Sequence, residues 1–149
     1  MSVQYDVFVA SFLQKISEYD FLDIPSDDRE TIVDGYLKRA VTAFRKNCLY
    51  DLVGSVNDET RSFDIEISSD DLEELVEIIS EGMVVQWLKP YIYQQELLQN
   101  VLNTRDYTQY SPAELLLRVG NAYKSAQKDY TQMIREYSYN HGRLTDLHI

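Results

Sequence analysis

The chain has 149 residues, of which 44% are hydrophobic and 26% are charged, proportions that are typical of one globular domain and exclude a largely disordered chain. Its formal net charge of −11 excludes the usual kind of nucleic-acid-binding protein, which needs clustered Lys and Arg to neutralise phosphates. The same charge disfavours anionic membrane surfaces, and no apolar run approaches the roughly 18 residues that a membrane-spanning helix needs.

Two amphipathic helices are predicted in the first third of the chain. Apolar residues recur at helical spacing over residues 4–19, and the pattern breaks before Pro25. Ser26 is the expected N-cap of the second helix, which is predicted to run to about Lys46 with acidic residues in its first turn. Gly35 lies in the middle of that helix, where glycine costs about 1 kcal/mol relative to alanine, so close packing against a neighbour is expected there.

Residues 47–68 lack a helical period and are predicted to hold a small β element. Phe63–Ile67 alternates apolar and polar residues, which is the strand pattern, and the turn formers Gly54 and Asn57 precede it. A hairpin with residues 49–53 as the partner strand is the simplest pairing. Because a two-stranded ribbon alone is marginal in water, we expect this element to pack on the helices or on a partner.

The third predicted helix is expected to form the core. Ser68 or Ser69 is expected to cap its start, and acidic residues in its first turns complement the helix dipole. Its second half is apolar on nearly all sides as far as Leu88, which is typical of a central, buried helix. Pro90 is predicted to end or kink this helix, and a fourth helix is predicted over residues 91–102.

The clearest helix start in the sequence is Ser111–Glu114, where Ser at the N-cap, Pro at the first helical position and Glu at the third form a capping box. This last helix is predicted to reach Tyr139, before the natural stop at Gly142. Its apolar residues step alternately by three and four, the heptad spacing of a coiled-coil seam. The heptad seam consists of Leu116, Val119, Tyr123, Ala126, Tyr130, Met133 and Tyr137.

These elements together predict a mainly α fold, a bundle of about five helices with a small β-hairpin or strand element near residues 49–67. Residues 1–142 are predicted to form a single helical domain, and residues 143–149 a C-terminal tail. The N-terminus has no basic stretch before an apolar core, so no secretory signal is expected, and folding in a cytosol is predicted.

Candidate sites for chemistry are few. The acidic residues between 64 and 74 lack the ligand order and the glycine of a Ca²⁺ loop, so a solvated face and a dipole-matched helix start are the favoured interpretation. His141 and His148 have no Cys at metal spacing, and Cys48 is expected at a helix C-terminus, where the dipole opposes a thiolate. We therefore predict that the protein is not an enzyme and has no cofactor and no metal; a helical enzyme with an acid-based metal site is the third-ranked interpretation.

Three segments resemble the head–tail connector proteins of tailed bacteriophages, which are also called neck, adaptor or head-completion proteins. They are the break at residues 23–28 followed by the Ile32–Phe44 helix with Ala40 and Ala43, the stretch Glu81–Pro90, and the long terminal helix with its short tail. The resemblance implies a structural virion protein, assembled in the host cytoplasm, that forms a homo-oligomeric ring of commonly about twelve copies below the portal. Such a ring extends the DNA channel without binding DNA specifically, and joins the head to tail or further neck proteins.

Two sets of partner-binding residues follow. The resemblance implies that the portal protein is met through the C-terminal tail, which points to Arg143, Leu144, Leu147 and Ile149. The chain has 12 Tyr, whose large rings with a polar tip suit surfaces that become buried in a complex. The seam tyrosines are therefore predicted to bind a partner: Tyr123, Tyr130 and Tyr137. The alternative function is a cytosolic helical interaction module, a regulator or adaptor, that binds a partner helix with this seam.

The acidic excess lies entirely in the first half of the chain. Residues 1–80 carry 18 acids and 7 bases, whereas residues 81–149 carry 7 of each. In a ring, an acidic first half would line the DNA channel and keep DNA from adhering. The residues hypothesised to face the channel are Asp58, Glu59, Asp64 and Glu66.

Overall fold

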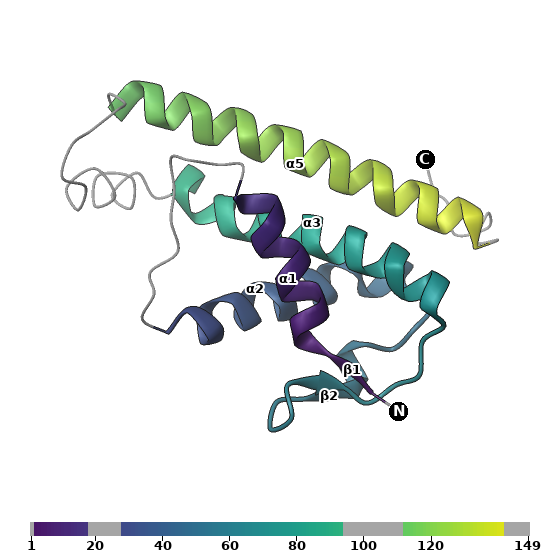
Figure 1. The fold of residues 1–149 in the computed structure, drawn as a ribbon. Coiled ribbons are helices and arrows are strands. Elements are labelled where there is room, and N and C mark those ends of the chain that lie inside the picture. Colours follow the sequence, from purple (N-terminus) through teal and green to yellow (C-terminus); the bar gives the residue numbers. More distant parts are fainter. Residues whose placement is uncertain (1, 18–27, 94–111, 142–149) are drawn as a thin grey trace.

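The computed structural model describes residues 2–17, 28–93 and 112–141, and it confirms a mainly helical fold with a small antiparallel sheet (Figure 1). The helices are α1 (Tyr5–Ile16), α2 (Arg29–Phe44), α3 (Ser69–Tyr93) and α5 (Pro112–Asn140). Short 3₁₀ turns lie at η1 (Arg45–Asn47) and η2 (Val53–Ser55). The strands are β1 (Val3–Gln4), β2 (Val56–Asn57) and β3 (Ser62–Phe63).

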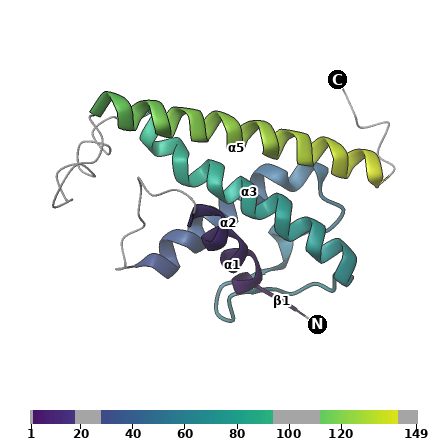
Figure 2. The ribbon, with the colours of Figure 1, turned by 45° about the horizontal axis from the view of Figure 1, so that its top comes forward.

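α3 is the central helix, as its apolar character predicts. It contacts α1, α2 and α5, and its buried residues extend from Leu75 to Leu88. α5 lies antiparallel along α3, while α1 and α2 cover other sides of it (Figure 1, Figure 2). Trp87 is fully buried and packs edge-on against Phe12 of α1, with ring centroids 6.3 Å apart, so it is a core residue.

The starts of α3 and α5 agree with the sequence, whereas α2 begins at Arg29 with Asp28 at its N-cap position; the predicted cap Ser26 lies outside the described residues. Ser68 Oγ accepts a hydrogen bond of 3.3 Å from the backbone N–H of Asp71, so Ser68 is the N-cap of α3, and α5 begins at Pro112. α3 continues through Pro90 to Tyr93, so the predicted end at Pro90 and the separate helix starting at residue 91 are wrong, while the alternative of a kink at Pro90 stays a prediction. The buried residues just before Pro90 hold this part of the helix against its neighbours. The rest of the predicted fourth helix, residues 94–102, lies outside the described residues.

The predicted hairpin partner is also wrong. β3 lies between β1 and β2, with Phe63 opposite both Val3 and Val56, whereas residues 49–53 form a loop and the start of a 3₁₀ turn. Phe63 is fully buried, and its ring centroid lies 4.9 Å from that of Tyr5. This aromatic packing holds the N-terminal segment beside β3, so the expected contact between the β element and the helices is confirmed.

Arg61 joins the β2–β3 hairpin to the helices, a role that the sequence did not reveal. Its Nε and Nη2 donate to the two carboxylate oxygens of Asp34 on α2, each at 2.8 Å, and its Nη1 donates to Asp6 of α1 at 2.9 Å. Its backbone carbonyl accepts the Tyr5 N–H at 2.8 Å. Hydrogen bonding to Asp34 raises the pKa of the Arg61 guanidinium above its ordinary value, so the group stays charged.

The tight helix crossing lies at Gly82, and the expectation of close packing at Gly35 is wrong. A Cβ built at Gly35 has no neighbour within 4 Å. A Cβ built at Gly82 lies 2.9 Å from Cε1 of Tyr130 on α5 and 3.2 Å from Cβ of Ala40 on α2. Glycine at position 82 therefore allows α3 to approach α2 and α5 at the same point.

Candidate functional site

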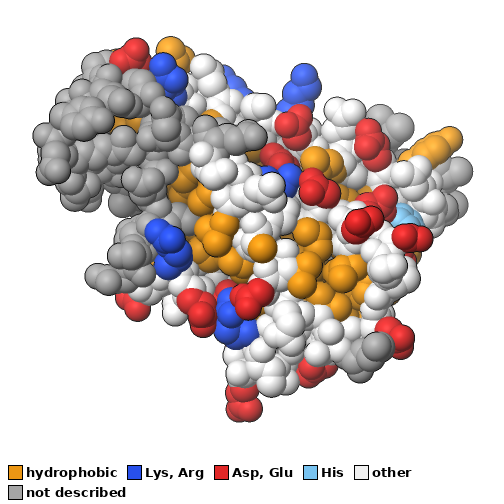
Figure 3. Space-filling view, in the orientation of Figure 1, with side chains coloured by type: hydrophobic (Ala, Val, Ile, Leu, Met, Phe, Trp, Pro, Cys, Tyr) orange, Lys and Arg blue, Asp and Glu red, His pale blue; other side chains and the backbone are white. Residues whose placement is uncertain are grey.

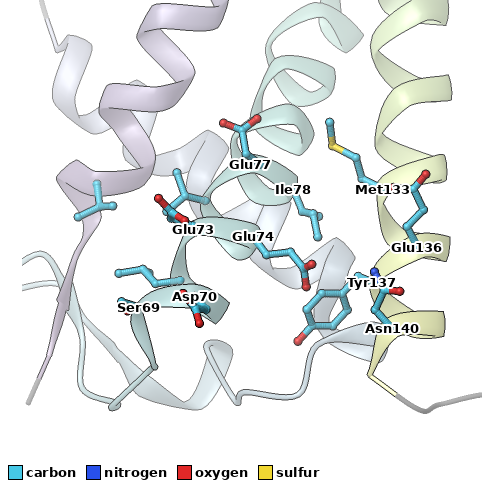
Figure 4. A pocket seen from close by; sticks show the side chains of 13 residues that line it. Ser69, Asp70, Glu73, Glu74, Glu77, Ile78, Met133, Glu136, Tyr137 and Asn140 are labelled. Carbon is cyan, nitrogen blue, oxygen red and sulfur yellow. The ribbon is translucent and has the colours of Figure 1, made fainter.

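An open groove of about 1020 Å³ lies between the first turns of α3 and the last turns of α5, beside the start of α1 (Figure 4). Its floor is apolar and draws on all three helices. The apolar lining residues are Val7, Leu72, Val76, Ile78, Met133 and Tyr137. Figure 3 shows hydrophobic side chains on this face of the molecule with acidic side chains around them. The groove is therefore an apolar surface that solvent reaches.

The rim of the groove is acidic. Its carboxylates come from both helices and are Asp70, Glu73, Glu74, Glu77 and Glu136. On α3 these acids occupy one position and the positions three, four and seven residues after it, so they lie along one side of the helix. Within the described ranges Asp70 and Glu73 form no ion pair, and Glu136 accepts only a hydrogen bond from Gln132, at 3.2 Å. These three rim carboxylates thus have no cation beside them among the described residues.

The other two rim carboxylates hold neighbouring helices together. Glu77 Oε2 lies 3.0 Å from Nζ of Lys15 on α1. Glu74 Oε1 lies 2.7 Å from Nε2 of His141, just after α5, so this contact joins the start of α3 to the end of α5. His141 is the one histidine in the described part of the chain, and its position beside Glu74 gives it a structural contact that its sequence neighbours did not indicate.

Tyr137 is a core residue, which corrects its predicted role in binding a partner. It is 1% exposed, its ring packs edge-on against Phe44 at 5.2 Å, and its hydroxyl accepts the backbone N–H of Leu49 at 3.1 Å. Burial raises the pKa of Tyr137 to about 12. The side chain binds the end of α5 to α2 and to the loop after it; although it lines the groove, almost none of its surface is exposed there, so the open part of the floor comes from the other apolar residues.

The rest of the heptad seam also turns inward. Val119 and Ala126 are buried, and Tyr123 and Tyr130 are half-buried. The Tyr130 hydroxyl is buried without a hydrogen-bond partner among the described residues, and burial raises its pKa to about 12. The physical reason is that the apolar stripe of an amphipathic helix packs on the nearest apolar surface, which here is α3 of the same chain. The predicted tail contacts Arg143, Leu144, Leu147 and Ile149 lie outside the described residues.

The four acids of the channel hypothesis are exposed side chains on the β2–β3 hairpin and the segment after it, but their surroundings differ. Asp58 lies 2.6 Å from Nζ of Lys38 and accepts a hydrogen bond from the Tyr5 hydroxyl at 3.0 Å; both contacts hold the pKa of this carboxyl below its usual range. Asp64 accepts a hydrogen bond from the Asn57 side chain at 3.1 Å. Glu59 and Glu66 form no ion pair in the described ranges. Of the four acids, these two are exposed and have side chains with neither an ion pair nor a hydrogen bond in the described part of the chain.

The acidic cluster near the start of α3 serves the fold locally. The Tyr50 hydroxyl donates to Asp71, a contact that lowers the pKa of that carboxyl. Across residues 2–17, 28–93 and 112–141, no three His, Cys, Asp or Glu side chains are placed to hold a metal ion, and Cys48 is buried. None of the helices in these ranges combines the length and the apolar character that a membrane crossing requires.

The sequence contained one overlooked signal for the groove. Acids at positions 70, 73 and 77 alternate with apolar residues at 72 and 76 at the start of one helix. This arrangement places an apolar strip beside an acidic strip, but the other wall belongs to a helix some 60 residues later, which the local pattern does not indicate. Comparison with family models, with curated protein sequences and with solved structures finds no match to this chain.

Proposed function

We propose that this protein is a structural virion protein of a tailed bacteriophage, a head–tail connector whose copies form a ring below the portal and join the head to the tail. The observation that carries the proposal is the open, acid-rimmed groove between α3 and α5. Apolar surface that stays open to solvent beside polar residues is typical of a site that another protein segment covers. A protein that works through such a contact surface fits an assembly role.

The stretch Glu81–Pro90, on which the resemblance to connector proteins partly rests, lies in the second half of the central helix. Met83, Trp87 and Leu88 within it are fully buried. The resemblance in this stretch is therefore a resemblance between buried core residues, and it supports the proposal at that level. The contacts of an assembled ring would come from the outer surfaces of α5, α3 and the hairpin, where side chains are free to differ between proteins that share a core.

Assembly is tested with the purified chain, alone and mixed with the portal protein encoded by the same genome. Size-exclusion chromatography with light scattering, followed by electron microscopy, is expected to show a ring of about twelve copies, at least when the portal is present. A monomer under both conditions would contradict the connector function. A monomer that binds a helical peptide would favour the interaction module, and stabilisation by a divalent metal would favour the enzyme interpretation.

The channel role is proposed for Glu59 and Glu66, because Asp58 is already paired with Lys38. Particles assembled with Glu59→Lys and Glu66→Lys are expected to release their DNA more slowly, since lysines in the channel would attract phosphates. The rate of DNA ejection measures this. Asp129→Lys, which changes one exposed acid of α5, is the matched control for each of the two single substitutions and is expected to leave the rate unchanged. Equal rates for the double variant and the unmodified protein would rule out the channel role.

A further inference from the structure

The outer face of α5 carries basic residues, whereas the rim of the groove is acidic. The residues of this outer stripe are Leu117, Lys124, Lys128, Arg135 and Tyr139. They follow one another at intervals of seven and four residues, so they share one side of the helix, turned away from the buried side that packs on α3. Leu117 is 63% exposed and Tyr139 is 65% exposed. The stripe thus combines three bases with two large exposed apolar side chains.

The bases of the outer stripe have no acidic partner among the described residues. Lys124, Lys128 and Arg135 form no ion pair within the described ranges. The positions between them on the same face are Asn121 and Gln132, which carry no charge. The stripe is therefore a basic surface without internal neutralisation, on a chain whose net charge is −11.

The groove and the outer stripe are complementary in charge, and the stripe is long enough to span the rim. The rim from Asp70 to Glu77 extends about 10 Å along α3, and the bases from Lys124 to Arg135 extend about 16 Å along α5, at about 1.5 Å per residue. Within one chain the two surfaces do not meet, because the groove lies between α3 and α5 whereas the stripe lies on the exposed side of α5, opposite its buried residues. The complement of each surface must come from a second molecule.

We propose that the groove of one copy receives the outer stripe of α5 from a second copy. The lysines of the stripe then meet the rim carboxylates, and an exposed apolar side chain of the stripe covers the apolar floor. Since the two surfaces differ, the contact is head-to-tail, and every copy offers one surface of each kind to its neighbours. Such a contact closes into a ring when the rotation between copies allows it, so this inference rests on the proposed ring for its biological setting.

The test exchanges charges between the two surfaces. The groove variant carries Glu73→Lys and Glu136→Lys, and the stripe variant carries Lys124→Glu and Lys128→Glu; all four side chains are exposed, so both variants are expected to fold. In sedimentation velocity at low salt, the unmodified chain is expected to self-associate as its concentration rises. Each variant alone is expected to associate at least about tenfold more weakly, because like charges face each other across the contact.

An equimolar mixture of the two variants is expected to recover association. In the mixture the lysine-bearing groove meets the acidic stripe, and the unmodified groove meets the unmodified stripe. Added salt is expected to weaken the association of the unmodified chain, as it screens the exposed charges. Glu59→Lys with Glu66→Lys adds the same charge at residues that do not line the groove; it is the matched control and is expected to associate like the unmodified chain.

Several outcomes would overturn this pairing, and they differ from the outcome that would overturn the connector function. Association that persists in either variant, a mixture that does not recover, or an unmodified chain that stays monomeric at all concentrations would each exclude it. In all three cases a ring formed with the portal protein would still support the connector. If only the groove variant lost binding to the portal, the groove would be assigned to the portal and not to a second copy.

Discussion

Replacing Gly82 with alanine is expected to lower the free energy of unfolding by about 1–2 kcal/mol, although alanine is the better helix former by about 1 kcal/mol. The added methyl would lie 2.9 Å from the Tyr130 ring and 3.2 Å from the Ala40 side chain, both closer than ordinary van der Waals contact. Because α3 is packed on both sides at this point, relief requires the Tyr130 ring or the helices to shift. Gly82→Leu is expected to cost more, about 3 kcal/mol. Urea unfolding measures both.

The matched control for Gly82 is the glycine at position 35. Both lie inside long helices, but a Cβ at Gly35 meets no atom within 4 Å. Gly35→Ala is therefore expected to raise the free energy of unfolding by about 0.5–1 kcal/mol, the ordinary helix-propensity gain. Opposite signs for the two substitutions would establish that Gly82 is required by packing. Stabilisation by both would contradict the tight crossing.

Substitutions at Tyr130 test whether its ring atoms cause the destabilisation expected for Gly82→Ala. Tyr130→Phe removes only the hydroxyl and leaves the ring atoms near position 82, so the cost of Gly82→Ala is expected to persist in that background. Tyr130→Leu removes those ring atoms, and Gly82→Ala is expected to become neutral or stabilising there. The difference between the two double-mutant cycles gives the interaction energy of the methyl group with the ring.

Replacing Arg61 with alanine is expected to destabilise the protein by about 2 kcal/mol. The substitution breaks the two-pronged hydrogen bonding to Asp34 and the contact to Asp6, and it leaves the Asp34 carboxylate, whose side chain is 16% exposed, without its cation. The effect is smaller than for a fully buried pair because the Arg61 side chain is 24% exposed and water screens part of the interaction. Thermal unfolding at low and high salt measures it, with a smaller loss expected at high salt.

Two further substitutions separate the side chain of Arg61 from its backbone. Arg61 has a φ of 50°, the left-handed region that glycine adopts without strain. Arg61→Gly is therefore expected to be about 1 kcal/mol more stable than Arg61→Ala, although both lack the guanidinium. Arg61→Lys keeps the charge but not the fork that binds both Asp34 oxygens, so an intermediate loss is expected. Equal stability of the alanine and lysine variants would contradict the role of the ion pairs.

The local features of this fold could be predicted from the sequence because they depend on neighbours along the chain. The capping hydrogen bond at Ser68 and the start of α5 at Pro112 follow from residues within three positions of each other. The central place of α3 follows from the apolar residues on all its sides, because a helix with such a surface must be buried away from water. The periodicity of apolar residues and the capping residues directly indicate such interactions between neighbours along the chain.

Pairings between distant segments were decided by the tertiary structure. β1 joins β3 beside the packing of Tyr5 on Phe63, and Arg61 meets acids on two different helices. Neither pairing is visible in the neighbouring residues of the sequence. The heptad seam was visible as a stripe, but whether it would face α3 or a partner depended on which apolar surface of the folded chain lay nearest. The groove arose in the same way, because one of its walls comes from α3 and the other from α5.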